Sequence, residues 1–275
     1  MSELSGRTFL ITGGNTGIGL ETARNLAGRG GRVYIACRSA AKGQAAVAAI
    51  KAASGNDAVD LLLLDLADLD SVRACAASFL ALDEPLHVLI NNAGLAGRQG
   101  VTRQGFELLF GVNHLGHFAL TTALLDRMRA SDAPRIVIVS SDAHYAAKDI
   151  DWAELRRRGH GIAAMHQYSV SKLCNVLFAQ ELARREPGIA CYALHPGVVA
   201  SDIWRRVPWP VRPLLKARML SVEDGAKTSL YCATAPEIAN ESGLFYDKCA
   251  HREPSRVATP ALAADLWDHS TAWTR

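Results

Sequence analysis

Several features that would assign this chain to a special class of protein are missing from its sequence. Its lysines and arginines are spread along the chain rather than gathered in blocks, and the formal net charge is only +3. No run of 18 apolar residues occurs, and no internal repeat, linker or low-complexity stretch is visible. The dispersed charge gives no support for nucleic-acid binding, and the missing apolar run predicts no transmembrane segment.

Cysteine motifs are missing as well. The six cysteines are widely separated, with no CxxC pair and no His/Cys cluster at metal-ligand spacing. We therefore expect no bound metal, and we expect the cysteines to be reduced thiols, mostly buried, in a cytoplasmic protein. The first strand is predicted near Arg7, which leaves no room for a signal peptide before it.

What the sequence does contain indicates one large α/β domain. The chain has 275 residues, 49% of them hydrophobic, which is enough for one large core spanning residues 1–275. Seven apolar segments predict strands, at residues 8–11, 33–37, 59–64, 86–90, 135–139, 189–194 and 243–246. Helical segments are predicted between them, at residues 20–29, 40–53, 70–82, 106–125, 168–182, 221–233 and from 260 onward. This alternation predicts a doubly wound parallel seven-stranded sheet with helices on both faces.

A glycine-rich turn follows the first strand. Gly13, Gly17 and Gly19 lie between that strand and the next helix, with the spacing GxxxGxG rather than GxGxxG. Glycines let the backbone approach a pyrophosphate while helix-end N–H groups point at it, so the order strand, turn, helix predicts a phosphate site. A tight strand-to-helix connection without a ligand is the alternative.

Other candidate residues follow later strands. Arg38 ends the second strand, where an arginine can pair with a 2′-phosphate, and it favours NADP unless it is only a solvated strand end. Val59 to Leu64 is apolar without alternation, which predicts a strand buried on both faces that ends at Asp65. The turn Asn91–Gly94 suits a cofactor that lies across the sheet, although it can also be only a turn.

Tyr168 and Lys172 are four residues apart, so on a helix they share one face. An ammonium about 4 Å from a phenol, at an effective dielectric of roughly 20, would lower the phenol pKa from about 10 by about 3, toward neutrality. An amphipathic surface helix is the alternative. Asn113 lies inside a predicted helix, where asparagine is unfavourable, and this predicts a local distortion or a buried polar role unless the amide lies at the surface.

Together these motifs resemble the short-chain dehydrogenase/reductase family. They occur in the family's order, as Thr12-Gly13-x3-Gly17-x-Gly19, Asn91-Asn92-Ala93-Gly94, Asn113, Ser141, Tyr168-x3-Lys172 and Pro196-Gly197. Within the family the chain is similar to the retinol-dehydrogenase-like, NADPH-preferring branch, through Asn15-Thr16-Gly17-Ile18-Gly19, Cys37-Arg38, the step from Ser141 to Tyr168, and the ending Tyr231-Cys232 to Leu266-Trp267. Members with a membrane anchor carry it ahead of the first strand, and no anchor is expected here.

The resemblance implies a Rossmann fold and a catalytic tetrad. In it, Ser141 hydrogen-bonds the substrate oxygen and Tyr168 exchanges its proton. Lys172 tunes that phenol and holds the nicotinamide ribose, while Asn113 positions a water in the proton path. Family alignment favours Ser141 over Ser140, because the catalytic serine is usually the second of such a pair.

The resemblance also implies a set of contacts with NADP(H). These residues are Gly13, Asn15, Thr16, Gly17, Ile18, Gly19, Arg38, Asp65, Leu66, Asn92, Ala93, Gly94, Tyr168, Lys172, Pro196, Gly197, Val199 and Ser201. Asp65 matches the adenine contact, and Ser201 stands where the family often has a threonine near the carboxamide. The glycine turn lacks the second basic residue of some NADP-dependent members, so Arg38 is expected to set that preference almost alone.

Residues 203–220, rich in tryptophan, proline and arginine, follow the sixth strand and predict a substrate lid at about 201–221. Trp204 and Trp209 would make its inner face apolar, which predicts a lipophilic alcohol or carbonyl substrate. Packing of a surface loop, or contact with a membrane surface, are the alternatives.

The expected activity is an NADP(H)-dependent exchange between an alcohol and a ketone or aldehyde. A non-catalytic NADP(H)-binding redox sensor and a reductase of a carbon–carbon double bond remain open. The resemblance also allows a homodimer or homotetramer.

Overall fold

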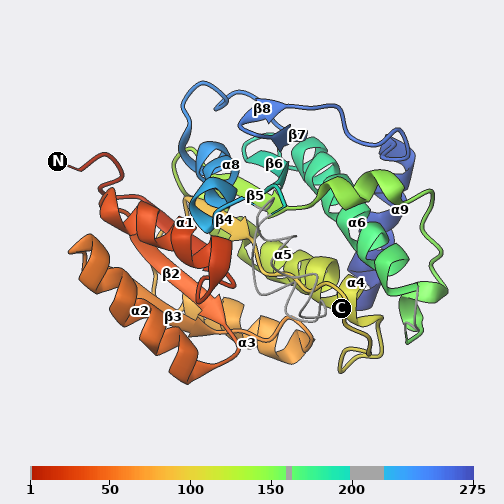
Figure 1. Ribbon diagram of the computed structural model, residues 1–275, viewed down its shortest axis with the longest axis horizontal. Helices are drawn as coiled ribbons and strands as arrows, with labels where there is room; N and C mark the ends of the chain where they lie inside the picture. The colour runs from red at the N-terminus through yellow and green to blue at the C-terminus, as the bar shows by residue number, and fades with distance from the viewer. Residues whose placement is uncertain (1, 159–162, 199–219) are drawn as a thin grey trace.

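The computed structural model describes residues 2–158, 163–198 and 220–275 (Figure 1). Its strands are β1 (Thr8–Thr12), β2 (Arg32–Cys37), β3 (Val59–Leu63), β4 (Val88–Asn91), β5 (Arg135–Val139), β6 (Ala190–His195), β7 (Leu244–Asp247) and β8 (Ala250–His251). They form one sheet in the order β3-β2-β1-β4-β5-β6-β7-β8, parallel from β3 to β7. The predicted doubly wound α/β sheet is thus confirmed.

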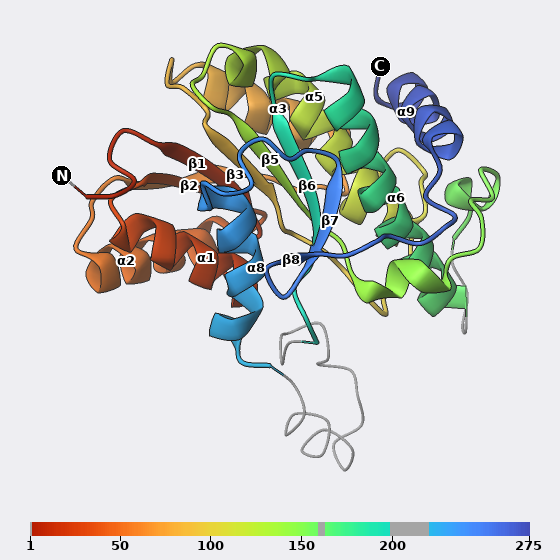
Figure 2. The ribbon, with the colours of Figure 1, turned by 90° about the horizontal axis from the view of Figure 1, so that it is seen from above.

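Helices cover both faces of this sheet (Figure 2). One face carries α1 (Gly17–Gly28), α2 (Ala40–Ser54) and α8 (Val222–Thr234), and the other carries α3 (Leu69–Leu80), α5 (Gly116–Arg129) and α6 (Ala163–Arg185). The last helix, α9 (Pro260–Thr274), packs against α6. The helix begins at Pro260, as the sequence predicts, and the hydroxyl of Thr259 at its N-cap accepts from Leu262 N.

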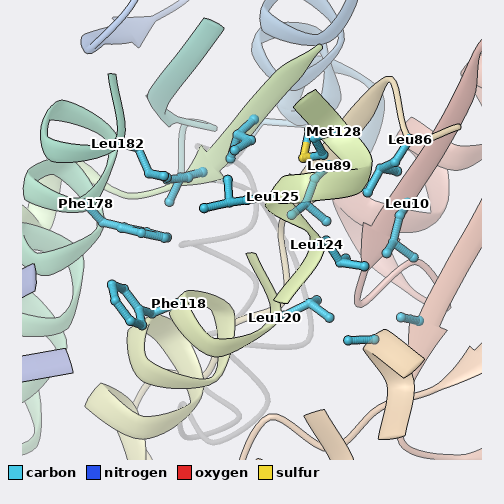
Figure 3. Close-up of a cluster of buried hydrophobic side chains, with 14 of the residues drawn as sticks. Leu10, Leu86, Leu89, Phe118, Leu120, Leu124, Leu125, Met128, Phe178 and Leu182 are labelled. Carbon is cyan, nitrogen blue, oxygen red and sulfur yellow. The ribbon is translucent and has the colours of Figure 1, made fainter. Parts of the chain in front are cut away.

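The central strands are buried on both faces, as a parallel sheet between two helix layers requires. Along β1, Phe9 and Ile11 belong to the core under α1 and α2, whereas Leu10 belongs to the core under α5. Figure 3 shows the core on the α5 side of the sheet, where Leu120 and Leu124 of α5 lie close to Leu10 and Leu89. Removing any of these large apolar side chains would cost about 2–5 kcal/mol of unfolding free energy.

The prediction that residues 59–64 form a strand buried on both faces is wrong. β3 lies at the edge of the sheet, and Leu63 there is 55% exposed. An apolar run reports the composition of a strand, but the strand's position in the sheet order decides how much of it is covered.

The prediction of seven strands misses β8, which pairs with β7 in an antiparallel hairpin. Lys248 and Cys249 form the two-residue turn between them, with φ values of 52° and 59°. Hairpin turns of this kind usually use Asn or Gly at positive φ, so this turn has no sequence signal.

The helix predicted at 106–125 is divided into three parts. A short α4 (Leu108–Phe110) is followed by a π-helical turn, η1 (Gly111–Leu115), and then by α5. Asn113 lies in the π-helical turn and is fully buried, so the expected local distortion and buried polar role are both confirmed. By length and composition alone the stretch Leu108–Arg129 could cross a membrane, but 78% of its apolar window is buried in the fold, as in a core helix.

The start of α6 differs from the sequence prediction, whereas the start of α8 agrees with it. The irregular stretch before Tyr168 contains the 3-10 helices η2 (Asp142–Ala146) and η3 (Glu154–Arg156), and α6 already begins at Ala163. The predicted cap at Ser221 is confirmed, because its hydroxyl accepts from Asp224 N at 3.0 Å.

All six cysteines are free thiols, and all are buried except Cys249, which is partly exposed.

Candidate active site

The candidate site lies at the carboxyl edge of the parallel strands, where the order of strands reverses beside β1. The turns that follow β1, β4, β5 and β6 meet there, and they carry most of the residues singled out in the sequence. In open α/β sheets ligands bind at such a reversal point, because the connections on its two sides go to opposite faces and leave a crevice.

The glycine turn after β1 takes a conformation that needs glycine. Gly13 and Gly17 have φ values of +68° and +55°, in the left-handed region. A Cβ on Gly19 would lie 2.4 Å from Asn92 Nδ2 and 2.6 Å from the Gly13 carbonyl oxygen, so the backbone approaches this closely only because a side chain is missing. Thr16 is exposed at the N-cap of α1, between the partly exposed Asn15 and Ile18, so this helix start opens to the outside.

Thr12 joins the glycine turn to the turn after β4. Its hydroxyl accepts from Asn92 N and Ala93 N, both at 2.9 Å, and its carbonyl accepts from Asn92 Nδ2 at 2.8 Å. The side chain of Asn92 is therefore used to support the glycine turn. The sequence does not show this role for Thr12, which it gives only as the first residue of a glycine motif.

The predicted cofactor contacts at the ends of β2 and β3 have different environments: Arg38 is exposed, whereas Asp65 and Leu66 are held by contacts within the protein. Arg38 is exposed and forms no ion pair with the described part of the chain. The backbone N–H of Asp65 donates to the Ser71 hydroxyl at 2.9 Å, and its carboxylate accepts from Ala67 N at 3.0 Å. Leu66 is buried, and its carbonyl would lie 2.6 Å from a Cβ on Gly116.

Both N–H groups of the Asn113 amide, and one acceptor position of its oxygen, are used within the protein. Its oxygen accepts from Leu95 N at 2.7 Å, and its nitrogen donates to Leu95 O at 3.0 Å and to the Ser171 hydroxyl at 2.9 Å. A Cβ on Gly94 would lie 3.5 Å from Asn113 Oδ1 and 3.6 Å from Lys172 Nζ. Gly94, Asn113 and Lys172 therefore converge at one point, while the amide itself has no hydrogen left for a water.

Ser140 and Ser141 have different environments. The Ser140 hydroxyl is 1% exposed and donates to the Lys172 carbonyl at 2.7 Å. Ser141 is partly exposed at the start of η2, where its hydroxyl accepts from Ala143 N at 3.2 Å, and it is near enough to Tyr168 to lower the pKa of that phenol. Of the two serines, Ser141 is thus the one open to a bound molecule, and its catalytic role stays a prediction.

The pKa of Tyr168 is raised, not lowered as the sequence predicts, because burial outweighs the hydrogen bond from Ser141. Lys172 Nζ lies 5.7 Å from the centroid of the Tyr168 ring and donates to the Val139 carbonyl at 3.0 Å. Burial in turn lowers the pKa of Lys172 to about 8. The expectation from spacing alone left out desolvation, which the fold imposes on both groups.

Sequence reasoning missed two polar residues that support this pair. Ser171 contacts the Asn113 amide, and Asn175 Nδ2 donates to the same Val139 carbonyl as Lys172, at 3.0 Å. Both are buried. Small polar residues inside an otherwise apolar helical run were the only available signal.

Pro196 and Gly197 follow β6 at the carboxyl edge of the sheet. Gly197 has a φ value of +85°, and a Cβ there would lie 2.3 Å from Leu220 Cδ1. Leu220 N donates to Val198 O at 2.9 Å, so the chain before residue 199 and the chain after residue 219 meet beside Gly197. Val199, Ser201 and residues 201–219 of the expected lid lie outside the described residues. Within the described ranges, no group of His, Cys, Asp and Glu could hold a metal ion.

Comparisons with known proteins agree on one family. A family model described as short chain dehydrogenase matches residues 7–150. Retinol dehydrogenase 12 of Mus musculus is 44% identical over 278 residues, which cover 98% of this chain and 86% of that protein. A crystal structure of an uncharacterized protein from Mycobacterium paratuberculosis is 34% identical with a TM-score of 0.78, covering 98% of this chain and 94% of that one.

A structure of a short chain dehydrogenase from Shigella flexneri, complexed with NADP, shares the fold. It is 21% identical, with a TM-score of 0.71, and the match covers 90% of this chain and 98% of that one.

Proposed function

Because the chain belongs to the short-chain dehydrogenase family, in its retinol-dehydrogenase-like branch, we propose that it is an NADP(H)-dependent oxidoreductase that interconverts a lipophilic alcohol with a ketone or aldehyde. One observation carries the proposal, namely that Ser141, Tyr168 and Lys172 come together: Lys172 Nζ lies 5.7 Å from the centroid of the Tyr168 ring, and Ser141 is near enough to lower the pKa of the Tyr168 phenol against the effect of burial. A proton donor, a second hydrogen-bond donor and a cation are what reduction of a carbonyl needs.

The residues at the sheet edge fit a dinucleotide. The close approach at Gly19 and the open start of α1 suit a pyrophosphate. The Gly94 backbone and Lys172 Nζ, which lie close together, would line the nicotinamide end, and Pro196 and Gly197 would border it. When bound, the cofactor supplies or accepts the hydride, and every proton movement is left to the chain's own side chains.

Tyr168 serves as the proton donor. A phenol whose pKa is raised keeps its proton at neutral pH, so Tyr168 can donate to a carbonyl oxygen. Ser141 holds that oxygen by a second hydrogen bond. The Lys172 ammonium then stabilises the negative charge that the departing proton leaves on the phenol.

Preference for NADP(H) follows from Arg38. An exposed arginine without a carboxylate partner in the described part of the chain is free to bind a phosphate in bidentate fashion. The Shigella flexneri relative binds NADP in its crystal structure, which agrees with the proposal at the level of the fold.

A lipophilic substrate follows from the relatives and from the sequence between Val198 and Leu220. Retinol dehydrogenases are named for a polyene alcohol, and the segment predicted as a lid is attached at both ends beside Gly197. Trp204→Ala and Trp209→Ala should lower kcat/KM selectively for a large apolar carbonyl such as all-trans-retinal. Equal losses for a small polar carbonyl, with a lower Tm, would indicate core packing instead.

Substrate profiling tests the proposal. The purified chain is incubated with NADPH or NADH and a panel of aldehydes, ketones and activated alkenes, and nicotinamide absorbance is followed. We expect turnover of apolar aldehydes or ketones with NADPH. Turnover of alkenes alone would make the protein a double-bond reductase. Tight NADPH binding without any turnover would make it a redox sensor.

Location and assembly stay predictions. A cytoplasmic location is tested by cell fractionation, and recovery with the membranes would contradict it. A homodimer or homotetramer is tested by light scattering of the purified chain.

A further inference from the structure

His117 lies one helical turn after Asn113, and its imidazole joins two parts of the site. The side chain is 1% exposed. Its Nδ1 lies 3.0 Å from the Asn113 carbonyl oxygen, and its Nε2 lies 2.8 Å from the Thr12 hydroxyl. One ring therefore contacts both the residue of the π-helical turn and the residue that supports the glycine turn.

These partners favour one protonation state of the ring. A carbonyl oxygen accepts but cannot donate, so Nδ1 must carry the hydrogen toward Asn113. In the neutral ring Nε2 is then an acceptor, and the Thr12 hydroxyl donates to it.

The Thr12 hydroxyl has no further capacity. Its two acceptor positions are taken by Asn92 N and Ala93 N, and its one hydrogen has His117 Nε2 at 2.8 Å as the near acceptor and the Ile90 carbonyl oxygen at 3.5 Å as a more distant one. A protonated His117 would direct a third donor at this oxygen. Burial, opposed by the Asn113 hydrogen bond and helped by the charge of Lys172, lowers the pKa of His117 to about 4, so the ring is neutral at physiological pH.

We propose that His117 is a positioning residue that holds the Asn113 carbonyl and the cofactor-binding turn in fixed relation to each other. It contacts neither substrate nor cofactor. It acts through Thr12 on the Asn92–Ala93 turn and the glycine turn, and through Asn113 on the point where Gly94 and Lys172 converge. The inference rests on the proposed function for its kinetic consequences, but the hydrogen-bond arrangement stands without it.

Three variants separate the two contacts. His117→Leu removes both. His117→Asn keeps an N–H near the place of Nδ1 and loses the contact with Thr12, whereas His117→Gln keeps an acceptor near the place of Nε2 and loses the contact with Asn113. A displacement of about 1 Å at a catalytic group can cost on the order of 10²-fold in rate.

We therefore expect His117→Asn to raise the Kd of NADPH with kcat largely kept, and His117→Gln to lower kcat with the Kd largely kept. His117→Leu should show both losses. Equal changes in the three variants, or a kcat and Kd that follow Tm alone, would overturn the proposal.

His87 supplies the matched control. It is also a buried histidine bound to β1, where its Nδ1 accepts from Thr8 N at 3.0 Å, but at the opposite end of the strand. His87→Leu should lower Tm and leave the Kd of NADPH and kcat unchanged. A rise in Kd for His87→Leu as large as that for His117→Leu would show that loss of a buried histidine explains the effect.

Nitrogen-15 NMR of the imidazole rings decides the arrangement without any turnover. His117, assigned by the signal lost in His117→Gln, should show the Nδ1–H tautomer and stay neutral down to about pH 5. An Nε2–H tautomer or protonation near pH 6 would overturn the inference. If no carbonyl is turned over, the proposed activity fails, while the tautomer and the Kd of NADPH still decide the role of His117.

Discussion

Replacing Lys172 by methionine should stabilise the protein while removing its activity. Lys172 is 4% exposed, and burial lowers its pKa from 10.5 to about 8. One pKa unit corresponds to about 1.4 kcal/mol, so the folded state holds this ammonium below about pH 8 at a cost of roughly 3 kcal/mol. Methionine has a similar length and no charge, and it adapts well to irregular sites.

Little hydrogen bonding is lost in exchange. Lys172 Nζ donates to the Val139 carbonyl, but Asn175 Nδ2 donates to the same oxygen, so that acceptor stays satisfied. Subtracting about 1 kcal/mol for the lost bond leaves a gain in unfolding free energy of about 2 kcal/mol near neutral pH. Activity should fall, since the cation beside the phenol is gone, and the Kd of NADPH should rise, since lysine is assigned to the ribose.

The sign of the pH dependence follows from the lowered pKa. Between about pH 8 and about pH 10.5 the unfolded chain binds the lysine proton and the folded chain does not, so the wild type gains stability as the pH rises. Urea unfolding of both proteins should thus show an advantage for Lys172→Met that shrinks by roughly 2 kcal/mol between about pH 7 and about pH 9.5. A variant that is less stable by the same amount at both pH values would refute the reasoning.

Five further substitutions, two of them controls, test other parts of the site. Ser141→Ala should lower kcat about 10²- to 10³-fold with little change in Tm. Ser140→Ala should lose about 1 kcal/mol of unfolding free energy, because its buried hydrogen bond to the Lys172 carbonyl is removed, and should keep most of its kcat. The reverse pattern would exchange the roles of the two serines. Arg38→Asp should shift the kcat/KM ratio from NADPH toward NADH by roughly 10- to 100-fold, and an unmoved ratio would show that another residue reads the phosphate. Gly19→Ala, with a Cβ 2.4 Å from a side-chain nitrogen, should cost about 1–3 kcal/mol and raise the Kd of NADPH, while Gly28→Ala, where the nearest atom is 4.0 Å away, should do neither.

Local chemistry explains what could be predicted from the sequence. The strand, glycine turn and helix at residues 8–28 follow from an apolar run and from glycines at positive φ. The cap at Ser221 and Pro260 at the start of α9 are likewise signals within a few residues of each other. Asparagine in a helix predicted a distortion, and the π-helical turn is that distortion.

The features that could not be predicted from the sequence depend on contacts between residues far apart in the chain. The partners of Asn113 are Leu95 and Ser171, which are 18 and 58 residues away, and nothing in the sequence pairs them. Burial of Tyr168 and Lys172 likewise depends on the whole fold, so a spacing of four residues predicted the wrong direction for the phenol pKa. The order of strands, which leaves β3 at an edge, also lies beyond local pattern.

The central claim is that Tyr168 supplies the proton for hydride transfer. Single-turnover oxidation of bound NADPH by all-trans-retinal, followed by nicotinamide absorbance in the wild type and in Tyr168→Phe, tests it most directly. Phenylalanine keeps the ring and removes only the hydroxyl, so the Kd of NADPH should be nearly unchanged while the transfer rate falls by roughly 10²- to 10⁴-fold. A Tyr168→Phe variant that binds NADPH and keeps most of its transfer rate would contradict the account.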